Sequence, residues 1–413
     1  MADTLRPRDA KDVEAALQSA LAAAKTVEIV GHGSKRAIGR PAQTDLTLDL
    51  SGLTGVTLYE PEELVLSAKA GTPLAEIEAL LAANGQQLAF EPMDYAVILG
   101  GHAGRGTIGG ALAANISGPR RIKAGAARDH FLGLSAVSGR GESFKSGGRV
   151  VKNVTGYDLC KLMAGSWGTL AAMIDVTIKV LPRPETEQTL LIRGLEPAQA
   201  IVAMSNAMGS SCDVSGAAHL PEDIAARLPA QEIAGGAVTA LRLEGFSPSV
   251  AARKDALEAL MKPFGELATA DAARSPALWT AIRDVTPFAA HASTPSPRGD
   301  KPPLWRISTA PSRGAELTAA IARSAPTRVF YDWAGGLIWL TVEADDDAGA
   351  AHVQRAVRAF GGHATLIRAP ASVRAAIDVF APQDRALAAL TKRVKESFDP
   401  QGVLNPGRMW AGV

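Results

Sequence analysis

The sequence predicts an α+β protein with two main domains, because a β-rich segment is followed by one in which helices and strands alternate. The chain has 413 residues, which suggests two or three domains at roughly 150 residues each. Short apolar strands dominate residues 26–184, whereas helical stretches such as PSVAARKDALEALMKPFG alternate with strands such as AVTALRLEG over residues 188–365. The polar, proline-bearing segment LPRPETE lies between the two patterns. We therefore expect domains over residues 1–184 and 185–365, and a C-terminal segment over 366–413.

The first domain is expected to begin with a helix and to continue as a series of short strands. Val13, Leu17 and Leu21 lie on one face of the N-terminal helix. The strand candidates are TVEIV (26–30), LTLDL (46–50), GVTLY (55–59), ELVLSAKAG (63–71), FLGLSAVSG (131–139), GRVVKNV (148–154) and a long strand within GTLAAMIDVTIKVLPRPE (168–185).

Two further helices carry start or packing signals. Thr72 is expected to cap a helix that has Pro73 in its first turn and that Gly85 ends. Near the C-terminus, residues 382–398 show an amphipathic pattern, followed by the tail FDPQGVLNPGRM with its Asp-Pro and Asn-Pro-Gly turns. The apolar stripes of the two helices are Leu74, Ile77, Leu80 and Leu81, and Leu387, Leu390, Val394 and Phe398.

Composition argues against several classes of function. Lys+Arg 43 against Asp+Glu 42 leaves no basic excess, so nucleic acid is not expected as the main partner. The two cysteines, Cys160 and Cys212, cannot build a disulfide framework or a cysteine metal site, which fits a reducing cytosol. The charged N-terminus lacks the apolar run of a signal peptide, and no stretch approaches 18 apolar residues. We expect a cytoplasmic protein that meets a membrane only indirectly, through partner subunits.

A glycine motif raises one functional interpretation. Gly104, Gly106 and Gly109 have the spacing G-x-G-x-x-G, and Asp129 follows twenty residues later, as in dinucleotide-binding Rossmann units. That fold needs a strand directly before the first glycine and a second strand ending at the acidic residue. Here the apolar run AVIL ends at Leu99, five residues too early, and Asp129 precedes a strand instead of ending one. The motif therefore does not indicate a Rossmann domain.

The glycines still predict a ligand. Gly109 and Gly110 open the small-residue segment ALAANISG, where missing side chains allow a ligand to approach the backbone and the N–H groups of a helix start suit a phosphate. The segment GHGSK at 31–35 is a second glycine turn directly after a strand, another geometry that cradles anions. Two such loops in one domain indicate a dinucleotide with an extended diphosphate.

Longer motifs carry a resemblance to a known family. GHGSK, then TIGGALAANISGPRR, then GRVVKNVTGYDLCKLMAGSWGTLAAMIDVTIKVLPRPE resemble the PCMH-type FAD-binding domain of the vanillyl-alcohol oxidase family. The tail FDPQGVLNPGRM resembles the C-terminal end of its FAD-linked oxidases, and residues 49–94 are similar to FAD-binding E-type subunits of bacterial glycolate oxidases. The resemblance implies a two-subdomain FAD domain, an α+β cap domain and a tail that returns to the FAD domain. It also implies FAD as the cofactor.

The resemblance further implies which residues contact FAD. Residues 31–35 would wrap the diphosphate through backbone N–H groups, and residues 107–110 and 115–118 would line the flavin and phosphates. The full expected set is Gly31, His32, Gly33, Ser34, Lys35, Pro92, Gly101, Thr107, Ile108, Gly109, Gly110, Ala113, Asn115, Ser117, Gly118, Arg128, Tyr157, Gly168 and Ile174. Some relatives attach FAD through a histidine in the first glycine loop. Ser34 occupies that position here, so we expect non-covalent FAD.

The second domain departs from the family pattern. Relatives that oxidise 2-hydroxy acids carry a histidine-rich motif there, which helps to bind a metal and the substrate, but the matching region 331–343 contains no histidine. The seven histidines (32, 102, 130, 219, 291, 352 and 363) show neither H-x-H nor H-x-x-x-H spacing, so no metal is expected. Oxidation of an α-hydroxy acid needs a base and usually a cation for the carboxylate. The sequence does not reveal either group, and the catalytic residues stay unassigned.

The resemblance therefore implies an FAD-carrying subunit of a glycolate dehydrogenase complex, working with a catalytic D-type flavoprotein subunit and an iron–sulfur F-type subunit. Electrons from the oxidation of glycolate to glyoxylate would pass toward the iron–sulfur subunit. Two alternatives stay open: a self-sufficient FAD-dependent 2-hydroxy-acid dehydrogenase, and a structural subunit with an idle flavin site.

Other conspicuous residues have a plain and a functional interpretation. Arg120, Arg121, Lys123 and Arg128 form a basic cluster that is either solvated or in contact with FAD phosphates or an acidic partner. Tyr157 either lies near the flavin or belongs to a turn. For Trp333, which precedes Gly335-Gly336, a place in the core or against a partner is favoured over stacking on substrate.

Overall fold

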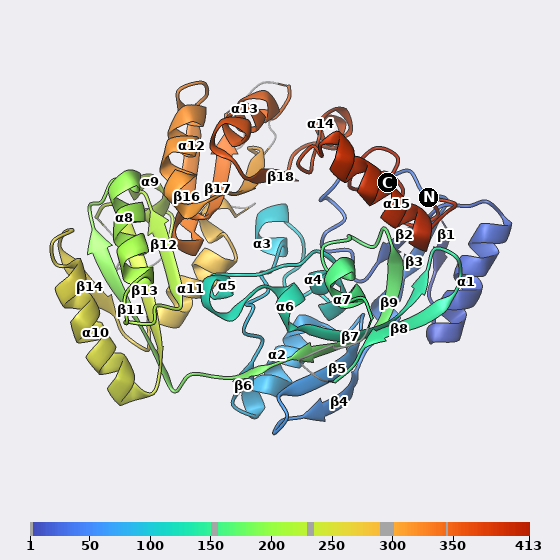
Figure 1. Ribbon diagram of the computed structural model, residues 1–413, viewed down its shortest axis with the longest axis horizontal. Coiled ribbons are helices and arrows are strands. Elements are labelled where there is room, and N and C mark those ends of the chain that lie inside the picture. The colour runs from blue at the N-terminus through green and yellow to red at the C-terminus, as the bar shows by residue number, and fades with distance from the viewer. Residues whose placement is uncertain (1–2, 150–155, 229–234, 290–300, 344–345) are drawn as a thin grey trace.

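The computed structural model describes residues 3–149, 156–228, 235–289, 301–343 and 346–413. Figure 1 shows two halves side by side, with residues up to about 182 and the C-terminal helix on the right and the remaining residues on the left. The sequence predicted this α+β architecture, and the structure confirms it. The residue limits of the domains stay a prediction.

Two main sheets build the first half. In the smaller, parallel sheet β3 lies between β1 and β2, and the larger, antiparallel sheet has the order β4-β5-β9-β7-β8. A further short antiparallel pair is formed by β6 and β10. The strands are β1 (Asp3–Leu5), β2 (Val27–Val30), β3 (Leu46–Asp49), β4 (Val56–Glu60), β5 (Val65–Lys69), β6 (Gln86–Gln87), β7 (Phe131–Ser138), β8 (Ser143–Gly147), β9 (Ala171–Lys179) and β10 (Leu181–Pro182).

Short helices connect these strands. The first begins at Asp9, whose side chain accepts a hydrogen bond from the Asp12 amide, and it buries Val13 and Leu17 against the parallel sheet. The helices of this half are α1 (Ala10–Ala22), α2 (Leu74–Ala83), α3 (Ala96–Leu99), α4 (Ile108–Ala113), α5 (Arg121–Ala124), α6 (Ala127–His130) and α7 (Leu159–Met163).

The local structure differs from the sequence-based expectations at three places, and a fourth expectation falls mostly outside the described residues. Thr72 does not cap α2: its hydroxyl donates to the Lys69 carbonyl instead, and Pro73 stands at the N-cap. The run AVIL is the helix α3 and not a strand, which removes the Rossmann interpretation altogether. Leu387 and Leu390 are 47% and 48% exposed, so only the later part of that apolar stripe is packed. The strand expected over 148–154 falls mostly outside the described residues.

The second half is one eight-stranded antiparallel sheet with helices packed on it. Its order is β14-β11-β13-β12-β16-β17-β15-β18. The strands are β11 (Thr186–Arg193), β12 (Gly216–Leu220), β13 (Val238–Gly245), β14 (Leu267–Ala270), β15 (Leu304–Ser308), β16 (Thr327–Asp332), β17 (Leu337–Val342) and β18 (His363–Arg368). The helices are α8 (Pro197–Met208), α9 (Glu222–Ala225), α10 (Ser247–Met261), α11 (Ser275–Arg283), α12 (Gly314–Ala322) and α13 (Ala350–Phe360).

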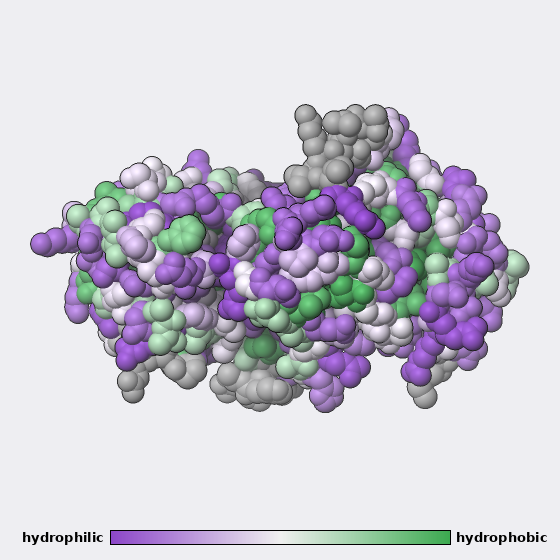
Figure 2. All heavy atoms as spheres, turned by 90° about the horizontal axis from the view of Figure 1, so that it is seen from below, coloured by the Kyte–Doolittle hydropathy of each residue, from purple (hydrophilic) through white to green (hydrophobic). Residues whose placement is uncertain are grey.

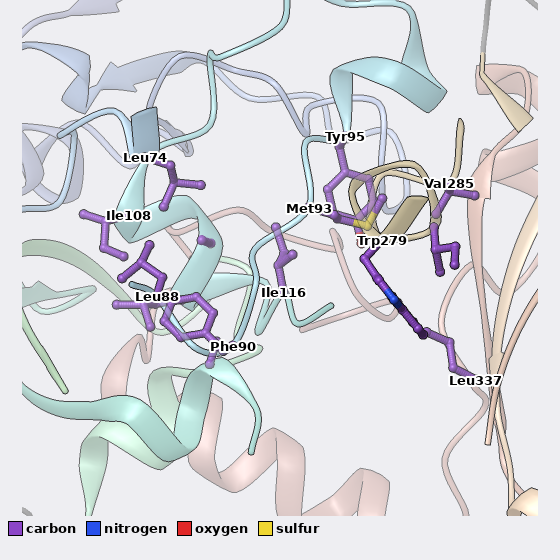
Figure 3. Packing of buried hydrophobic residues seen from close by; sticks show 14 of the residues in the cluster. Leu74, Leu88, Phe90, Met93, Tyr95, Ile108, Ile116, Trp279, Val285 and Leu337 are labelled. Atoms are coloured by element: carbon purple, nitrogen blue, oxygen red, sulfur yellow. The ribbon is translucent and has the colours of Figure 1, made fainter. Parts of the chain in front are cut away.

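The two faces of this sheet belong to different cores, because side chains alternate along each strand. Trp305 and Ile307 pack with residues of α12 and α13. Phe330 and Trp339 join a cluster that also contains Phe90 and other residues of the first half. Figure 3 shows part of this shared cluster, with Tyr95 and Met93 of the first half beside Trp279 and Val285 of the second. A continuous hydrophobic core therefore joins the halves.

A buried ion network also joins the halves, and we call it the Glu91 network. The Arg242 guanidinium donates to both oxygens of Glu91 at 3.0 Å and stacks 4.5 Å from the ring centroid of Trp279. Arg120 lies 2.7 Å from Glu91 and 2.6 Å from Glu244. Glu187 completes the network, 3.5 Å from Arg120. Glu91 and Arg120 come from the first half and the other members from the second, so the network fixes how the halves meet.

The C-terminal segment returns to the first half, as the resemblance implied. After α14 (Ala371–Ala376), helix α15 (Arg385–Phe398) packs on the first half, where the rings of Phe398 and Phe144 of β8 have centroids 5.9 Å apart. The tail then runs along β2: the Val27 amide donates to the Val403 carbonyl at 2.8 Å, and the Asn405 amide donates to the Val27 carbonyl at 2.9 Å. The Asn405 side chain accepts from the Ile29 amide and donates to the Trp167 carbonyl. These bonds place Arg408 beside the loop that follows β2.

No helix among the described residues is long and apolar enough to span a membrane. On the face shown in Figure 2, hydrophilic residues predominate and hydrophobic ones form small groups between them. That face is therefore suited to contact with water.

Candidate cofactor site

The two glycine loops of the sequence lie against each other in the structure. Residues 31–35 follow the end of β2, and Thr107 precedes α4. A Cβ added to Gly31 would lie 2.8 Å from Oγ1 of Thr107, and one added to Gly110 would lie 3.3 Å from Nζ of Lys35. Such distances are shorter than normal carbon contacts, so side chains at these positions would push the loops apart. Missing side chains allow the two bends to meet.

The first bend offers free backbone donors. The described hydrogen bonds leave the amides of Gly33, Ser34 and Lys35 without an acceptor, while Gly33 takes a left-handed conformation with φ of 71°. Successive amides around such a turn form a concave site for an anion. This geometry suits a phosphate group, and phosphate binding at the bend stays a prediction.

The second bend works differently from the sequence-based prediction. The Ile108 amide donates to the Thr72 carbonyl, and the Gly109 amide donates to the Ala70 carbonyl at 2.8 Å. The Thr107 hydroxyl caps α4 by accepting from the Gly110 amide at 3.2 Å. These donors are occupied because the start of α4 pairs with the chain after β5. The expectation that the start of α4 offers free N–H groups to a phosphate is therefore wrong. The small residues of this bend instead leave room for a ligand.

A pocket lies where the two bends meet, with about 720 Å³ of space between atoms including its open mouth. Its walls come from the end of β2, the loop after it, α4, the turn at Trp167, strand β9 and Arg408 of the tail. Pockets of this size hold cofactors. Nearly all of the lining outside the first bend is apolar or small, including Ala70, Ala113, Ala171 and Met173.

Cationic side chains surround the first bend, and the guanidinium of Arg408 also lies 3.9 Å from the carboxylate of Glu28. Burial lowers the pKa of Lys35 to about 8, with Asp94 opposing this shift and Arg408 adding to it. Burial also lowers the pKa of Arg408, whose Nε is buried without a hydrogen-bond partner. Nδ1 of His32 is likewise buried and unpaired. Unsatisfied buried donors are costly, so this arrangement favours a bound anion.

The structure brings together ten of the residues expected at the site. All of them line the pocket: Gly31, His32, Gly33, Ser34, Lys35, Thr107, Gly109, Gly110, Ala113 and Gly168.

Other expected residues have different surroundings in the structure. Ile108 and Ile174 are buried in hydrophobic cores, and Pro92 is buried outside the pocket. Asn115, Ser117 and Gly118 each make a bond that holds their own loop: to the Arg128 amide, the Ala127 amide and Trp333 Nε1. Gly101, Arg128 and Tyr157 are exposed, and the exposed fraction of Tyr157 is 90%. These nine positions do not line the pocket, and contacts between them and FAD stay a prediction.

Sequence reasoning missed four prominent lining residues: Arg36, Trp167, Met173 and Arg408. Arg408 had a signal, since it belongs to the tail NPGRM that was expected to return to this domain. Trp167 takes a left-handed conformation, φ 54°, beside Arg408, whose guanidinium lies 5.6 Å from its ring centroid. Nothing in the pattern around Met173 distinguishes it from any strand residue.

The basic cluster after the second bend does not act as one unit. Arg120 belongs to the Glu91 network, Lys123 pairs with Asp213, and Arg128 is exposed. Arg121 stacks on Trp333, 4.2 Å from its ring centroid. None of the four lines the pocket. Among the described residues, no group of three or more His, Cys, Asp or Glu side chains could hold a metal ion.

Comparisons with known proteins identify the kind of ligand. The sequence profile of the FAD binding domain family matches residues 2–147, and that of the C-terminal domain of FAD linked oxidases matches residues 381–409. The chain is 33% identical over 384 residues to glycolate oxidase subunit GlcE of Escherichia coli, covering 93% of this chain and 92% of that protein. It is 30% identical to glycolate oxidase subunit GlcD of Bacillus subtilis over 151 residues, 37% of this chain and 30% of that protein.

The fold is also found in solved structures of other proteins. The structure of p-cresol methylhydroxylase with substrate bound superposes with a TM-score of 0.74 at 14% identity, covering 99% of this chain and 88% of that one. The matched families and the pocket together define an FAD-dependent oxidoreductase, with FAD as its cofactor. Within that class, the chain belongs to the family of glycolate oxidase subunit GlcE.

Proposed function

We propose that this chain carries FAD without a covalent bond, as a subunit of a glycolate dehydrogenase complex. The observation that carries the proposal is the pocket in which residues 31–35, α4 and Arg408 meet, in a chain similar to GlcE over 93% of its length. In the complex, electrons from the oxidation of glycolate to glyoxylate pass toward an iron–sulfur F-type subunit, beside a catalytic D-type flavoprotein subunit. The complex is cytoplasmic, and any contact with the membrane is made by these partners.

The residues of the pocket fit FAD in three ways. The amides of Gly33, Ser34 and Lys35 would donate to the diphosphate, while Lys35 and Arg408 would balance its negative charge. Gly109 and Gly110 leave room for the cofactor, and the apolar lining of Ala113, Ala171 and Met173 excludes water beside it. When bound, FAD supplies the acceptor for two electrons. Ser34 has no imidazole with which to attach the flavin, so acid precipitation should release FAD into the supernatant.

The charge of Lys35 predicts how FAD affinity depends on pH. In the empty pocket burial lowers the pKa of Lys35 to about 8, and the negative diphosphate would raise it again. Binding above about pH 8 therefore requires uptake of a proton, and Kd should rise by up to about tenfold per pH unit there. Titration of the apoprotein with FAD from about pH 7 to 9.5 measures this slope.

In the Lys35→Gln variant the affinity should be weaker at about pH 7 and nearly independent of pH. Lys392→Gln, which changes an exposed lysine on α15, is the matched control and should keep the wild-type slope. An equal slope in wild type and Lys35→Gln would show that this lysine does not face the diphosphate.

Anaerobic reduction of the flavin tests the proposed function. Purified chain should be yellow, and glycolate should bleach the flavin rapidly only when the D-type and F-type subunits are present. Bleaching by glycolate in the chain alone at the rate of the complex would instead identify a self-sufficient dehydrogenase. A flavin that never bleaches in the complete complex, or a colourless chain, would contradict the proposal and favour a structural subunit.

A further inference from the structure

Lys395 of α15 is a buried lysine, 4% exposed, that lies outside the lining of the cofactor pocket. Its ammonium group has three N–H donors, and each of them has an acceptor. The acceptors are the Asp399 carboxylate at 2.7 Å, the Thr169 carbonyl at 2.7 Å and the Leu404 carbonyl at 2.8 Å. One side chain therefore connects α15, the turn before β9 and the C-terminal tail.

Asp399 folds the tail back at the point where α15 ends. Its carboxylate is 1% exposed and accepts from the Val403 amide at 2.9 Å and from the Leu404 amide at 2.8 Å. Burial lowers the pKa of Lys395, whereas the charge of Asp399 opposes this shift. We call Lys395 and Asp399 the tail clip, because together they fix the course of the chain over residues 399–404.

Both segments that the tail clip holds continue into the walls of the cofactor pocket. Trp167, shortly before Thr169, lines the pocket, and so does Arg408, shortly after Leu404. Between them, the Asn405 side chain donates to the Trp167 carbonyl at 2.8 Å. The clip is therefore bonded to two parts of the pocket wall that are far apart in the sequence.

The end of the tail also reaches the first bend. The Arg408 guanidinium donates to the Lys35 carbonyl at 3.0 Å. Beyond it, the Trp410 ring lies 6.1 Å from the ring centroid of Phe380, which lies 5.6 Å from that of Trp167. The tail thus contacts the bend whose amides lack acceptors and the aromatic wall beside it.

The charges of the tail clip supply direction more than stability. Removal of two charges from water is so costly that apolar residues of similar volume often hold a core equally well or better. An ammonium group and a carboxylate, however, fix the positions of the carbonyls and amides to which they are bonded, as apolar contacts do not. Here those bonds define where the tail leaves α15 and how it runs toward the pocket.

We propose that the tail clip is a positioning pair for the cofactor: it holds Arg408 and Trp167 where they line the pocket, so that docking of the tail and binding of FAD stabilise each other. The inference rests on the proposed function in taking this pocket as the diphosphate site. By linkage, FAD must favour docking of the tail by the same factor by which docking favours FAD. Since the clip acts through Arg408, loss of both should cost little more than loss of one.

A double-mutant cycle tests this coupling by fluorescence titration of the apoproteins with FAD. Arg408→Met should weaken FAD binding about 50-fold in the wild-type chain, but less than about threefold in the Lys395→Met chain. Lys395→Met alone should weaken it at least about 30-fold. Lys392→Met is the matched control, since it changes an exposed lysine of the same helix, and it should bind FAD as the wild type does. Additive losses, or wild-type affinity in Lys395→Met, would overturn the proposal.

Digestion by a carboxypeptidase, followed by mass spectrometry, measures docking of the tail directly and needs no flavin. The residues after Arg408 should be removed at least about tenfold faster from Lys395→Met apoprotein than from wild-type apoprotein. Saturating FAD should slow their removal from the wild type at least about tenfold, but from Arg408→Met less than about twofold. Equal digestion of the two apoproteins would overturn the proposal. A wild-type chain that bound no FAD would contradict the proposed function instead.

Trp410→Ala is a second variant that releases the tail without leaving a charge buried, because the ring is only partly buried at the surface. It should weaken FAD binding about tenfold and speed digestion of the apoprotein in the same proportion. Wild-type behaviour of Trp410→Ala in both measurements would overturn the proposal, even if Lys395→Met did not fold.

Discussion

Replacement of Gly110 by valine is expected to weaken FAD binding at least about 100-fold, which corresponds to about 2.7 kcal/mol. A Cβ at this position would lie 3.0 Å from Oγ1 of Thr107 and 3.3 Å from Nζ of Lys35, and the two methyl groups beyond it would enter the pocket. The valine side chain would fill part of the space for the cofactor and would displace the ammonium group of Lys35. Fluorescence titration of the apoprotein with FAD measures the effect.

The apoprotein of this variant should stay folded. Gly110 lies within α4 with helical backbone angles, so a side chain there suits the helix better than glycine does. Gly148→Val is the matched control, because nothing lies within 4 Å of a Cβ at Gly148 and its φ is not positive. If Gly110→Val bound FAD as tightly as Gly148→Val, the diphosphate would not lie between the two bends.

Replacement of Glu91 by glutamine is expected to lower the free energy of unfolding by about 3 kcal/mol. The change removes the charge that faces Arg242, which is fully buried, and Arg120. Loss of one partner from a buried ion pair leaves the other charge without compensation, which is far more costly than loss of an exposed pair. Denaturation in urea measures the difference in the free energy of unfolding between the variant and the wild type.

Glu396→Gln on α15 is the comparison, since Glu396 forms an exposed pair with Lys392 at 3.8 Å. This substitution should lower the free energy of unfolding by less than about 1 kcal/mol. Equal effects of the two substitutions would show that the Glu91 network does not hold the halves together.

Acid should weaken the same network. Burial alone would raise the pKa of Glu91 and of Glu244, but the charges of Arg242 and Arg120 outweigh it, hold the pKa of Glu91 below its ordinary value and lower that of Glu244 to about 2. A carboxyl whose pKa is lower in the folded state stabilises the fold fully above its unfolded pKa, about 4.3 for glutamate. This contribution should be lost as the pH falls from about 4.3 toward 2. Urea denaturation across that range should show a smaller acid loss in Glu91→Gln than in wild type.

The sequence was sufficient for the parts of the fold that depend on local pattern. The strand before GHGSK and the helix start at Gly109 were predicted from an apolar run and from glycines, whereas the return of the tail was implied by the family resemblance. Thr72 shows where local pattern fails: it has the residue type of a helix cap, but the Lys69 carbonyl takes its hydroxyl. Leu387 and Leu390 fail in a similar way, because an apolar stripe says nothing about whether a partner surface is present.

The candidate site was predictable only where it is contiguous in sequence. Residues 31–35 and 107–110 could be assigned to one ligand from their glycines and the family resemblance, whereas Trp167 and Arg408 reach the pocket through tertiary contacts. The second bend had the residues of a phosphate-binding helix start, but pairing with the chain after β5 occupies its amides.

The most direct test of the account is a crystal structure of the chain with FAD bound. We expect oxygens of the diphosphate to lie within about 3.2 Å of the amide nitrogens of Gly33, Ser34 and Lys35. Gly110 should contact the diphosphate from the opposite side. A diphosphate bound elsewhere in the chain, with these amides facing solvent, would contradict it.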